Sequence, residues 1–156
     1  GCGMVSIFEY SPLIKHCLIF ALDPLLDEYR KILPFWDYVD DGGGIVYEQA
    51  NGEDIPFWDE TFNWACCINV LDHTPNPIRM LKEIERVLKV GGTLYIHVNF
   101  DPELYAAHYY LVDWDRFFEL IDNTNLSFIA SDFQANTELP GQSAIWATFR
   151  KEYMNV

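Results

Sequence analysis

The chain has 156 residues, of which 50% are hydrophobic and 22% are charged, and this ordinary globular composition excludes a disordered or low-complexity protein. Its 24 acidic residues outnumber its 10 basic residues, and the formal net charge of −14 disfavours nucleic acid and anionic membranes as partners because phosphate groups are repelled. The longest apolar run, residues 17–22, is far shorter than the roughly 18 residues of a membrane span, so we expect one soluble, cytoplasmic domain over residues 1–156.

The first predicted elements alternate between strand and helix. The apolar run 17–22 ends at Asp23-Pro24 and predicts a buried strand, because Pro24 has no N–H group to continue the hydrogen-bonding ladder. Residues 25–33 space their apolar side chains at helical intervals and predict a helix. After an aromatic, acidic and glycine-containing loop, residues 45–48 predict a second strand.

The middle of the chain contains the clearest helix signal. Residues 62–71 form a long apolar stretch that predicts a central strand. Asn76 and Pro77 then provide an N-cap and a first-turn proline, and the apolar residues that follow lie on one helical face. We expect Gly91-Gly92 to end this helix before another strand at residues 93–98.

The last third of the chain predicts one more helix and two strands. Residues 113–121 form an amphipathic helical pattern, and the β-rich runs 127–133 and 144–149 are expected to form an antiparallel hairpin at the sheet edge. Helices between parallel strands require right-handed crossovers and favour a doubly wound sheet. In such a sheet the ligand crevice lies beyond the carboxyl ends of the strands, so the loops that follow strands are the candidate functional segments.

The cysteines do not indicate a metal site. The four cysteines are Cys2, Cys17, Cys66 and Cys67, and no pair has the two-residue gap that usually brings two thiolates to one metal. Cys66 and Cys67 are adjacent in an apolar run, where strand geometry directs them to opposite faces. We therefore expect reduced, packed thiols and no bound metal.

A glycine turn and a carboxylate have the spacing of a nucleoside site. Gly1-Cys2-Gly3 allows a ligand to approach the backbone closely, and Asp23, twenty residues after Gly3, follows the next predicted strand. A carboxylate at that position can accept both hydrogens of a ribose diol. Taken alone, the glycines also fit an ordinary turn, and an Asp before Pro also fits a simple strand stop.

Four further blocks follow in a distinctive order. They are residues 50–57 (ANGEDIPF), 59–63 (DETFN), 69–77 (NVLDHTPNP) and 81–92 (LKEIERVLKVGG). Together with the glycine turn, the series resembles the small-molecule group of class I methyltransferases that use S-adenosylmethionine, from residue 1 to about residue 100. The resemblance implies a Rossmann-like, doubly wound, mostly parallel sheet with an antiparallel C-terminal strand, in three α/β/α layers. It also implies methyl transfer to a small-molecule acceptor.

The resemblance assigns cofactor contacts to positions that match the family motifs. Gly1, Cys2 and Gly3 match the turn along the methionine part of S-adenosylmethionine, and Asp23 matches the acidic residue that holds the ribose hydroxyls. The remaining matched positions are Pro24 and Leu25 beside the adenine, Asn51, Gly52 and Glu53 at the adenine edge, and Cys67, whose backbone approaches the amino acid moiety. Asn51 replaces the usual Asp, so it keeps an acceptor oxygen but loses the charge.

Three residues are candidates for the catalytic step. His73 is the leading candidate for a general base, because it follows a strand and the ordinary histidine pKa lies near neutral pH. Asp72 is a candidate to orient His73 or an acceptor hydroxyl, and His108 matches a segment that covers the substrate in related enzymes. The alternative for His73 is a loop-capping or structural histidine, and the alternative for Asp72 is a turn residue. His97 lies inside a predicted strand, so we expect it to be a packing or surface residue.

The sequence also departs from the family pattern. Val90 replaces the usual Pro before Gly91, and the central strand that precedes the glycine turn in this family is absent, so we expect either a fragment or a strand donated by another chain. A homo-oligomer is compatible with this expectation. A non-catalytic binding or partner subunit is one alternative function. An NAD-dependent oxidoreductase is another, although Ser6 lacks the third glycine of the dinucleotide fingerprint.

Overall fold

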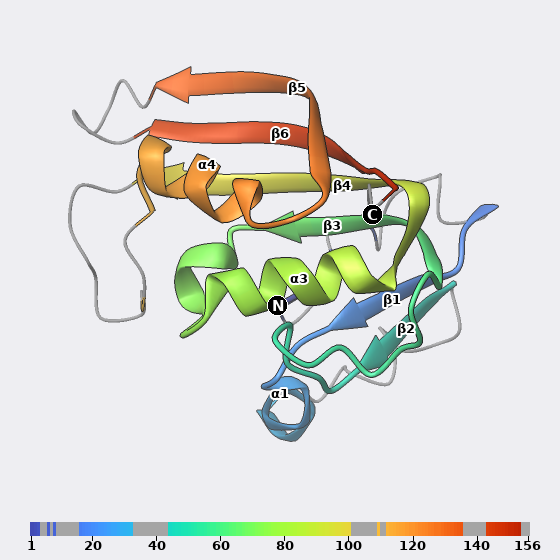
Figure 1. The fold of residues 1–156 in the computed structure, drawn as a ribbon. Helices are drawn as coiled ribbons and strands as arrows, with labels where there is room; N and C mark the ends of the chain where they lie inside the picture. The colour runs from blue at the N-terminus through green and yellow to red at the C-terminus, as the bar shows by residue number, and fades with distance from the viewer. Residues whose placement is uncertain are drawn as a thin grey trace. The chain divides into compact units, whose positions relative to one another are not determined.

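The computed structural model describes residues 1–3, 6, 8, 16–32, 44–100, 109, 112–135 and 143–153. The internal contacts of the chain divide it into two compact units, Gly1–Gly52 and Glu53–Val156. The prediction of a single domain therefore stays a prediction. Both units combine strands with helices, which confirms the predicted α/β class (Figure 1).

The first unit contains a two-stranded parallel sheet and one helix. Strand β1, Ile19–Leu22, pairs with strand β2, Ile45–Glu48, and helix α1, Leu26–Ile32, follows β1. Alternate strand residues are buried because successive side chains point to opposite faces of a strand. The buried core of this unit consists of Ile19, Ala21, Leu26, Ile45 and Tyr47. All three elements were predicted at these places.

The second unit contains a four-stranded sheet in the order β3-β4-β6-β5. Strand β3, Phe62–Ile68, is parallel to β4, Leu88–Phe100. Strand β6, Ser143–Lys151, is antiparallel both to β4 and to the edge strand β5, Leu126–Ala135. The predicted C-terminal hairpin is therefore confirmed. Among the described strands, β1 and β3 are each hydrogen-bonded along one edge only.

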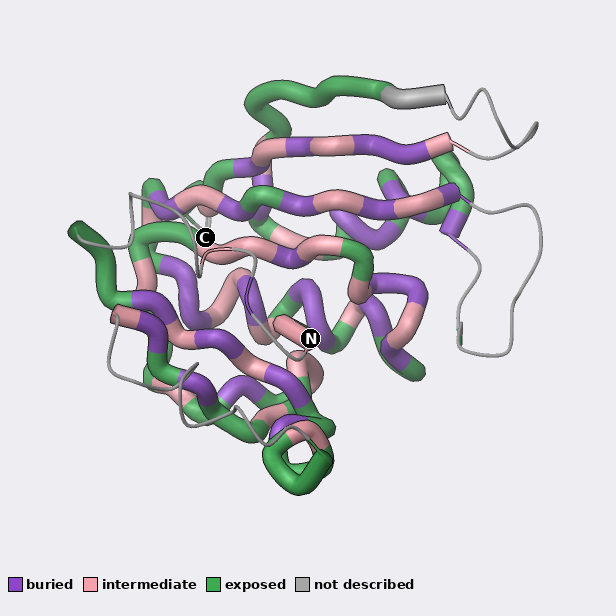
Figure 2. Tube along the Cα trace, turned by 180° about the vertical axis from the view of Figure 1, so that it is seen from behind, coloured by how far each residue is buried: buried purple, intermediate pink, exposed green. Residues whose placement is uncertain are grey.

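Two capped helices cover one face of this sheet (Figure 1). Helix α3, Pro77–Val87, begins where Asn76 Oδ1 accepts a hydrogen bond from the Arg79 N–H at 3.1 Å. Helix α4, Trp114–Asp122, is capped in the same way by Asp113. Viewed from behind, β4 and β6 largely alternate between buried and more exposed residues, whereas the edge strand β5 is exposed along most of its described length (Figure 2). In the part of the chain that is described, no helix is both long enough and apolar enough to cross a membrane.

The prediction that Gly91-Gly92 ends the helix is wrong. Helix α3 ends at Val87, and β4 already pairs at Leu88, opposite Phe62 of β3. Gly91 adopts a φ of +78°, and a Cβ atom on Gly92 would lie 2.7 Å from the Lys89 carbonyl oxygen. The two glycines therefore form an irregularity inside β4, where a left-handed residue and a close backbone approach are both required.

Candidate active site

The glycine turn and Asp23 lie in direct contact in the first unit. Asp23 directly follows β1, and its side chain is buried, with 5% of the residue exposed. Its Oδ2 atom accepts a hydrogen bond from the Gly3 N–H at 2.9 Å, and its Oδ1 atom accepts one from the Leu25 N–H at 2.9 Å. The Cys2 N–H donates to the Leu22 carbonyl oxygen at 2.8 Å. These bonds hold the glycine turn against the end of β1.

The glycines of this turn are required by the close approach of the carboxylate. A Cβ atom on Gly1 would lie 2.4 Å from Asp23 Oδ2, and Gly3 has a φ of +68°, which disfavours residues with a side chain. Burial raises the pKa of the Cys2 thiol to about 11, and the negative charge of Asp23 adds to the increase. Cys2 therefore remains a neutral thiol in this turn.

This arrangement fits the adenosyl part of S-adenosylmethionine. Each carboxylate oxygen can accept two hydrogen bonds, so Asp23 retains acceptor capacity for the two ribose hydroxyl groups. Pro24 and Leu25 are exposed directly after it, and Leu25 exposes 52% of its surface, which suits contact with a flat apolar ring. Asn51 and Gly52 also belong to this unit, at its end after β2. Their contact with the adenine edge stays a prediction.

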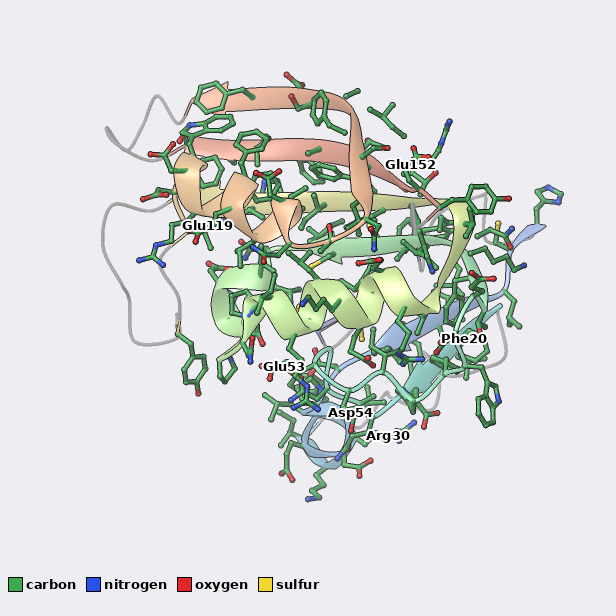
Figure 3. All side chains as sticks on the ribbon, in the orientation of Figure 1. Phe20, Arg30, Glu53, Asp54, Glu119 and Glu152 are labelled. Carbon is green, nitrogen blue, oxygen red and sulfur yellow. The ribbon has the colours of Figure 1, made fainter. Side chains whose placement is uncertain are left out.

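Glu53 organises the loop before helix α3 in the second unit. Its Oε1 atom accepts hydrogen bonds from the Thr74 hydroxyl and, at 3.0 Å, from the Asn76 N–H. Its carbonyl oxygen accepts a hydrogen bond from Arg79 Nε at 2.8 Å. Figure 3 labels Glu53 beside its neighbour Asp54. Sequence reasoning missed this structural role because the partners are more than twenty positions away. The adenine contact predicted for Glu53 stays a prediction.

Asp72 and His73 lie together beyond the carboxyl end of β3. Both belong to a short 3₁₀ turn, Leu71–His73. Asp72 Oδ1 lies 3.8 Å from His73 Nε2, and 4% of the Asp72 side chain is exposed against 33% for His73. A buried carboxylate beside a partly exposed imidazole can orient the ring. The structure therefore brings the two predicted catalytic residues together.

Two further residues of the second unit interact with the Asp72 carboxylate. Burial lowers the pKa of His97 on β4, and the charge of Asp72 partly opposes this decrease. Burial also raises the pKa of Cys67 to about 11, and Asp72 adds to that increase. The sequence predicted a packing or surface role for His97, because the register that aligns His97 with Ile68 of β3 depends on the pairing of two strands.

The third candidate, His108, lies outside the described residues. Its neighbour Tyr109 is described, and the Tyr109 N–H donates a hydrogen bond to the Asp72 carbonyl oxygen at 2.9 Å. The chain at Tyr109 therefore lies against the 3₁₀ turn that contains Asp72 and His73. The role of His108 stays a prediction.

Comparison with known families agrees with this arrangement. A sequence model described as "Methyltransferase domain" matches residues 1–96, which include the glycine turn, Asp23 and the turn at Asp72 and His73. The chain belongs to this methyltransferase family. A solved methyltransferase-fold structure, the PH0226 protein from Pyrococcus horikoshii OT3, superposes with a TM-score of 0.75 at 13% identity and covers 97% of this chain and 79% of that one. The predicted Rossmann-like fold is confirmed.

Curated relatives within this family have different acceptors. The tRNA U34 carboxymethyltransferase of Campylobacter hominis is 35% identical over 57 residues, which are 36% of this chain and 20% of that protein. The ubiquinone biosynthesis O-methyltransferase of Pseudomonas syringae pv. tomato is 23% identical over 107 residues, 67% of this chain and 45% of that protein. Five of the curated relatives that the chain matches, the Campylobacter hominis protein among them, are much longer proteins. The chain spans 17% to 31% of their length.

Proposed function

We propose that this protein transfers a methyl group from S-adenosylmethionine to a small-molecule acceptor. The observation that carries the proposal is the contact between the glycine turn and Asp23, in which Gly3 N–H donates to Asp23 Oδ2 at 2.9 Å. A glycine backbone beside a carboxylate at a strand end is the arrangement that binds a ribose in nucleoside sites. Membership of the methyltransferase family supports the adenosyl group of S-adenosylmethionine as that nucleoside.

The cofactor supplies a methyl group on a positively charged sulfonium, and the chain binds the acceptor and removes a proton from it. In the proposed reaction His73 takes a proton from the acceptor hydroxyl as the oxygen attacks. His73 Nε2 lies 3.8 Å from Asp72 Oδ1, so the carboxylate can hold the orientation of the ring during this transfer. The distance of 3.8 Å exceeds a hydrogen bond, and contraction on acceptor binding or one bridging water completes the contact. A positioned base of this kind contributes about 10²–10⁴-fold to the rate.

A small molecule is favoured over tRNA by charge. The net charge of −14 opposes binding of a polyanion, whereas it does not oppose a neutral metabolite. The relative from Pseudomonas syringae, named for ubiquinone biosynthesis, covers 67% of this chain, and the tRNA U34 carboxymethyltransferase of Campylobacter concisus covers 62%. The preference for a small acceptor therefore rests on the charge of the chain.

Calorimetric titration with S-adenosylhomocysteine, the product form of the cofactor, tests the proposal. We expect Asp23→Asn to weaken binding by about tenfold or more, because a charged hydrogen-bond acceptor is lost. Leu25→Ala, which changes an exposed side chain and leaves the turn intact, should weaken binding by about threefold or more. Asp27→Asn is the matched control, because Asp27 is exposed on α1 and pairs with Arg30.

Each outcome of this titration has a defined meaning. Binding that is weakened by the first two variants and unchanged by the control supports the proposal. Binding of NADH with no binding of S-adenosylhomocysteine contradicts it and favours an oxidoreductase. Binding of S-adenosylhomocysteine without methyl release to any acceptor contradicts the catalytic part and favours a non-catalytic subunit.

A further inference from the structure

Two asparagines from neighbouring strands form a pair at the carboxyl ends of β3 and β4. Asn69 directly follows β3, and Asn99 is the residue before the last residue of β4. The Asn99 Nδ2 atom donates to Asn69 Oδ1 at 2.6 Å, and the Asn69 N–H donates to the His97 carbonyl oxygen at 3.0 Å. The parallel register of the two strands, which pairs Ile68 with His97, brings the asparagines side by side.

The backbone at Asn69 adopts an unfavourable conformation. Its φ is +52°, in the left-handed region that residues with side chains rarely occupy, although Asn tolerates it better than most. Such a conformation persists where the surrounding structure holds it. Here the bond to the His97 carbonyl and the side-chain bond to Asn99 hold it. The turn thereby presents the Asn69 amide at an exposed position.

The pair leaves an unused NH₂ donor group and an unused oxygen acceptor next to each other. An amide carries an oxygen with two lone pairs and an NH₂ group with two N–H donors, and the bond between the asparagines uses one lone pair and one N–H. Within the described part of the chain, the Asn69 NH₂ group and the Asn99 oxygen have no other hydrogen-bond partner. Reversing both amides exchanges the two roles and still leaves one donor beside one acceptor.

A hydroxyl group matches this pair of atoms. It accepts a hydrogen bond through its oxygen and donates one through its hydrogen, whereas an ionised carboxylate can only accept. The neighbouring Asp72 carboxylate, three residues beyond Asn69, is buried and opposes a second negative charge nearby. The chemistry of this end of the sheet therefore selects a neutral hydroxyl over an anionic group.

We propose that Asn69 and Asn99 bind a neutral hydroxyl group of the methyl acceptor and thereby select acceptors that carry one. The inference rests on the proposed methyl transfer, because it concerns the acceptor of that reaction. The two asparagines are specificity-determining residues, and the proton transfer belongs to the His73 side chain. The pair distinguishes a free hydroxyl from its methyl ether, since the ether oxygen accepts a hydrogen bond but donates none.

The test uses the complete chain saturated with S-adenosylhomocysteine and three probes of similar shape: catechol, guaiacol and veratrole, which carry two, one and no free hydroxyl groups. Side-chain amide signals of Asn69 and Asn99 are followed by nuclear magnetic resonance during each titration. We expect catechol to shift both signals and to bind tightest, and veratrole, which can accept but not donate a hydrogen bond, to bind weakest and to shift the signals least. Saturation with S-adenosylhomocysteine is confirmed first, so a failure of cofactor binding is recognised as a failure of the proposed function.

Variants separate a binding role from a structural one. Asn69→Gly removes the amide and relieves the left-handed strain, and Asn99→Ala removes the other amide, so each should weaken catechol binding by about 3- to 10-fold without lowering the melting temperature by much. The matched control is Asn63→Ala, at the opposite end of β3, where Asn63 pairs with Lys89. Normal S-adenosylhomocysteine binding combined with unmoved amide signals, or with equal responses to catechol and veratrole, would overturn the inference.

Discussion

Arg86 holds Glu83 with two parallel hydrogen bonds, from Nε to Oε1 at 2.8 Å and from Nη2 to Oε2 at 2.7 Å. The same guanidinium donates to the carbonyl oxygens of Ile55 and Phe57 and to Asp59. Helix α3 is thereby tied to the loop that precedes β3. The pKa of Arg86 is raised by its bonds to Glu83 and Asp59, so the group stays charged.

Removal of this guanidinium should destabilise the second unit. Arg86→Ala leaves the carbonyl oxygens of Ile55 and Phe57 and the Glu83 carboxylate without this donor, so we expect a loss of about 2 to 4 kcal/mol in the free energy of unfolding. Urea denaturation measures the loss. Arg150→Ala is the control, because Arg150 is exposed on β6. A loss of the same size in both variants would contradict the anchoring role.

The Glu83 carboxylate should make stability dependent on pH. Its hydrogen bonds to Arg86 and, to a smaller extent, its bond to the Ile55 N–H lower the pKa of Glu83 relative to its value in the unfolded chain. The unfolded chain then binds the proton more readily, so this stabilisation is present above the ordinary glutamate pKa of about 4.3 and is lost as the pH falls below it. Denaturation midpoints of the wild type and Glu83→Gln should converge as the pH falls through that range. Parallel curves would argue against the lowered pKa.

His97 should also make the protein less stable as the pH falls, but over a higher pH range than Glu83. Burial against Trp146, whose ring centroid lies 4.1 Å from that of His97, lowers the pKa of the imidazole, and the Asp72 carboxylate opposes the decrease. Because the unfolded chain binds this proton more readily, stability is lost as the pH falls through the ordinary histidine pKa of about 6.5. His97→Gln should remove that part of the loss. A titration of His97 by nuclear magnetic resonance with a midpoint above the ordinary value would refute this.

The cysteines should differ in their reactivity with iodoacetamide. Burial raises the pKa of Cys66 to about 12 and that of Cys67 to about 11, so both thiols remain protonated at neutral pH. Cys17 is exposed and should be alkylated first. Mass spectrometry of the native protein over time measures the order. Rapid modification of Cys67 in the folded protein would contradict its burial.

The sequence predicted the elements better than the contacts between them. Local patterns located β1 and β2 and the Asn76 cap of α3, because strand alternation and capping depend on nearby residues. The role of Gly92 was misjudged because β4 already pairs with β3 at Leu88, and within this strand pairing the carbonyl oxygens of Lys89 and Asn63 both approach Gly92 closely.

In the candidate site, too, the sequence predicts some contacts and misses others. The Gly3–Asp23 contact could be anticipated from the family spacing, and Asp72 and His73 are adjacent in the chain. The pairing of Asn69 with Asn99 could not be, because it depends on the register between β3 and β4, which the amino-acid pattern does not encode locally.

The amide signals of Gly3 and Leu25 test the central claim most directly, because both groups donate to the Asp23 carboxylate. Nuclear magnetic resonance of the isotope-labelled chain follows these two signals during a titration with S-adenosylhomocysteine. If the glycine turn and Asp23 bind the adenosyl group, both signals shift and saturate together. Saturable binding of S-adenosylhomocysteine that leaves both signals unchanged would contradict the account.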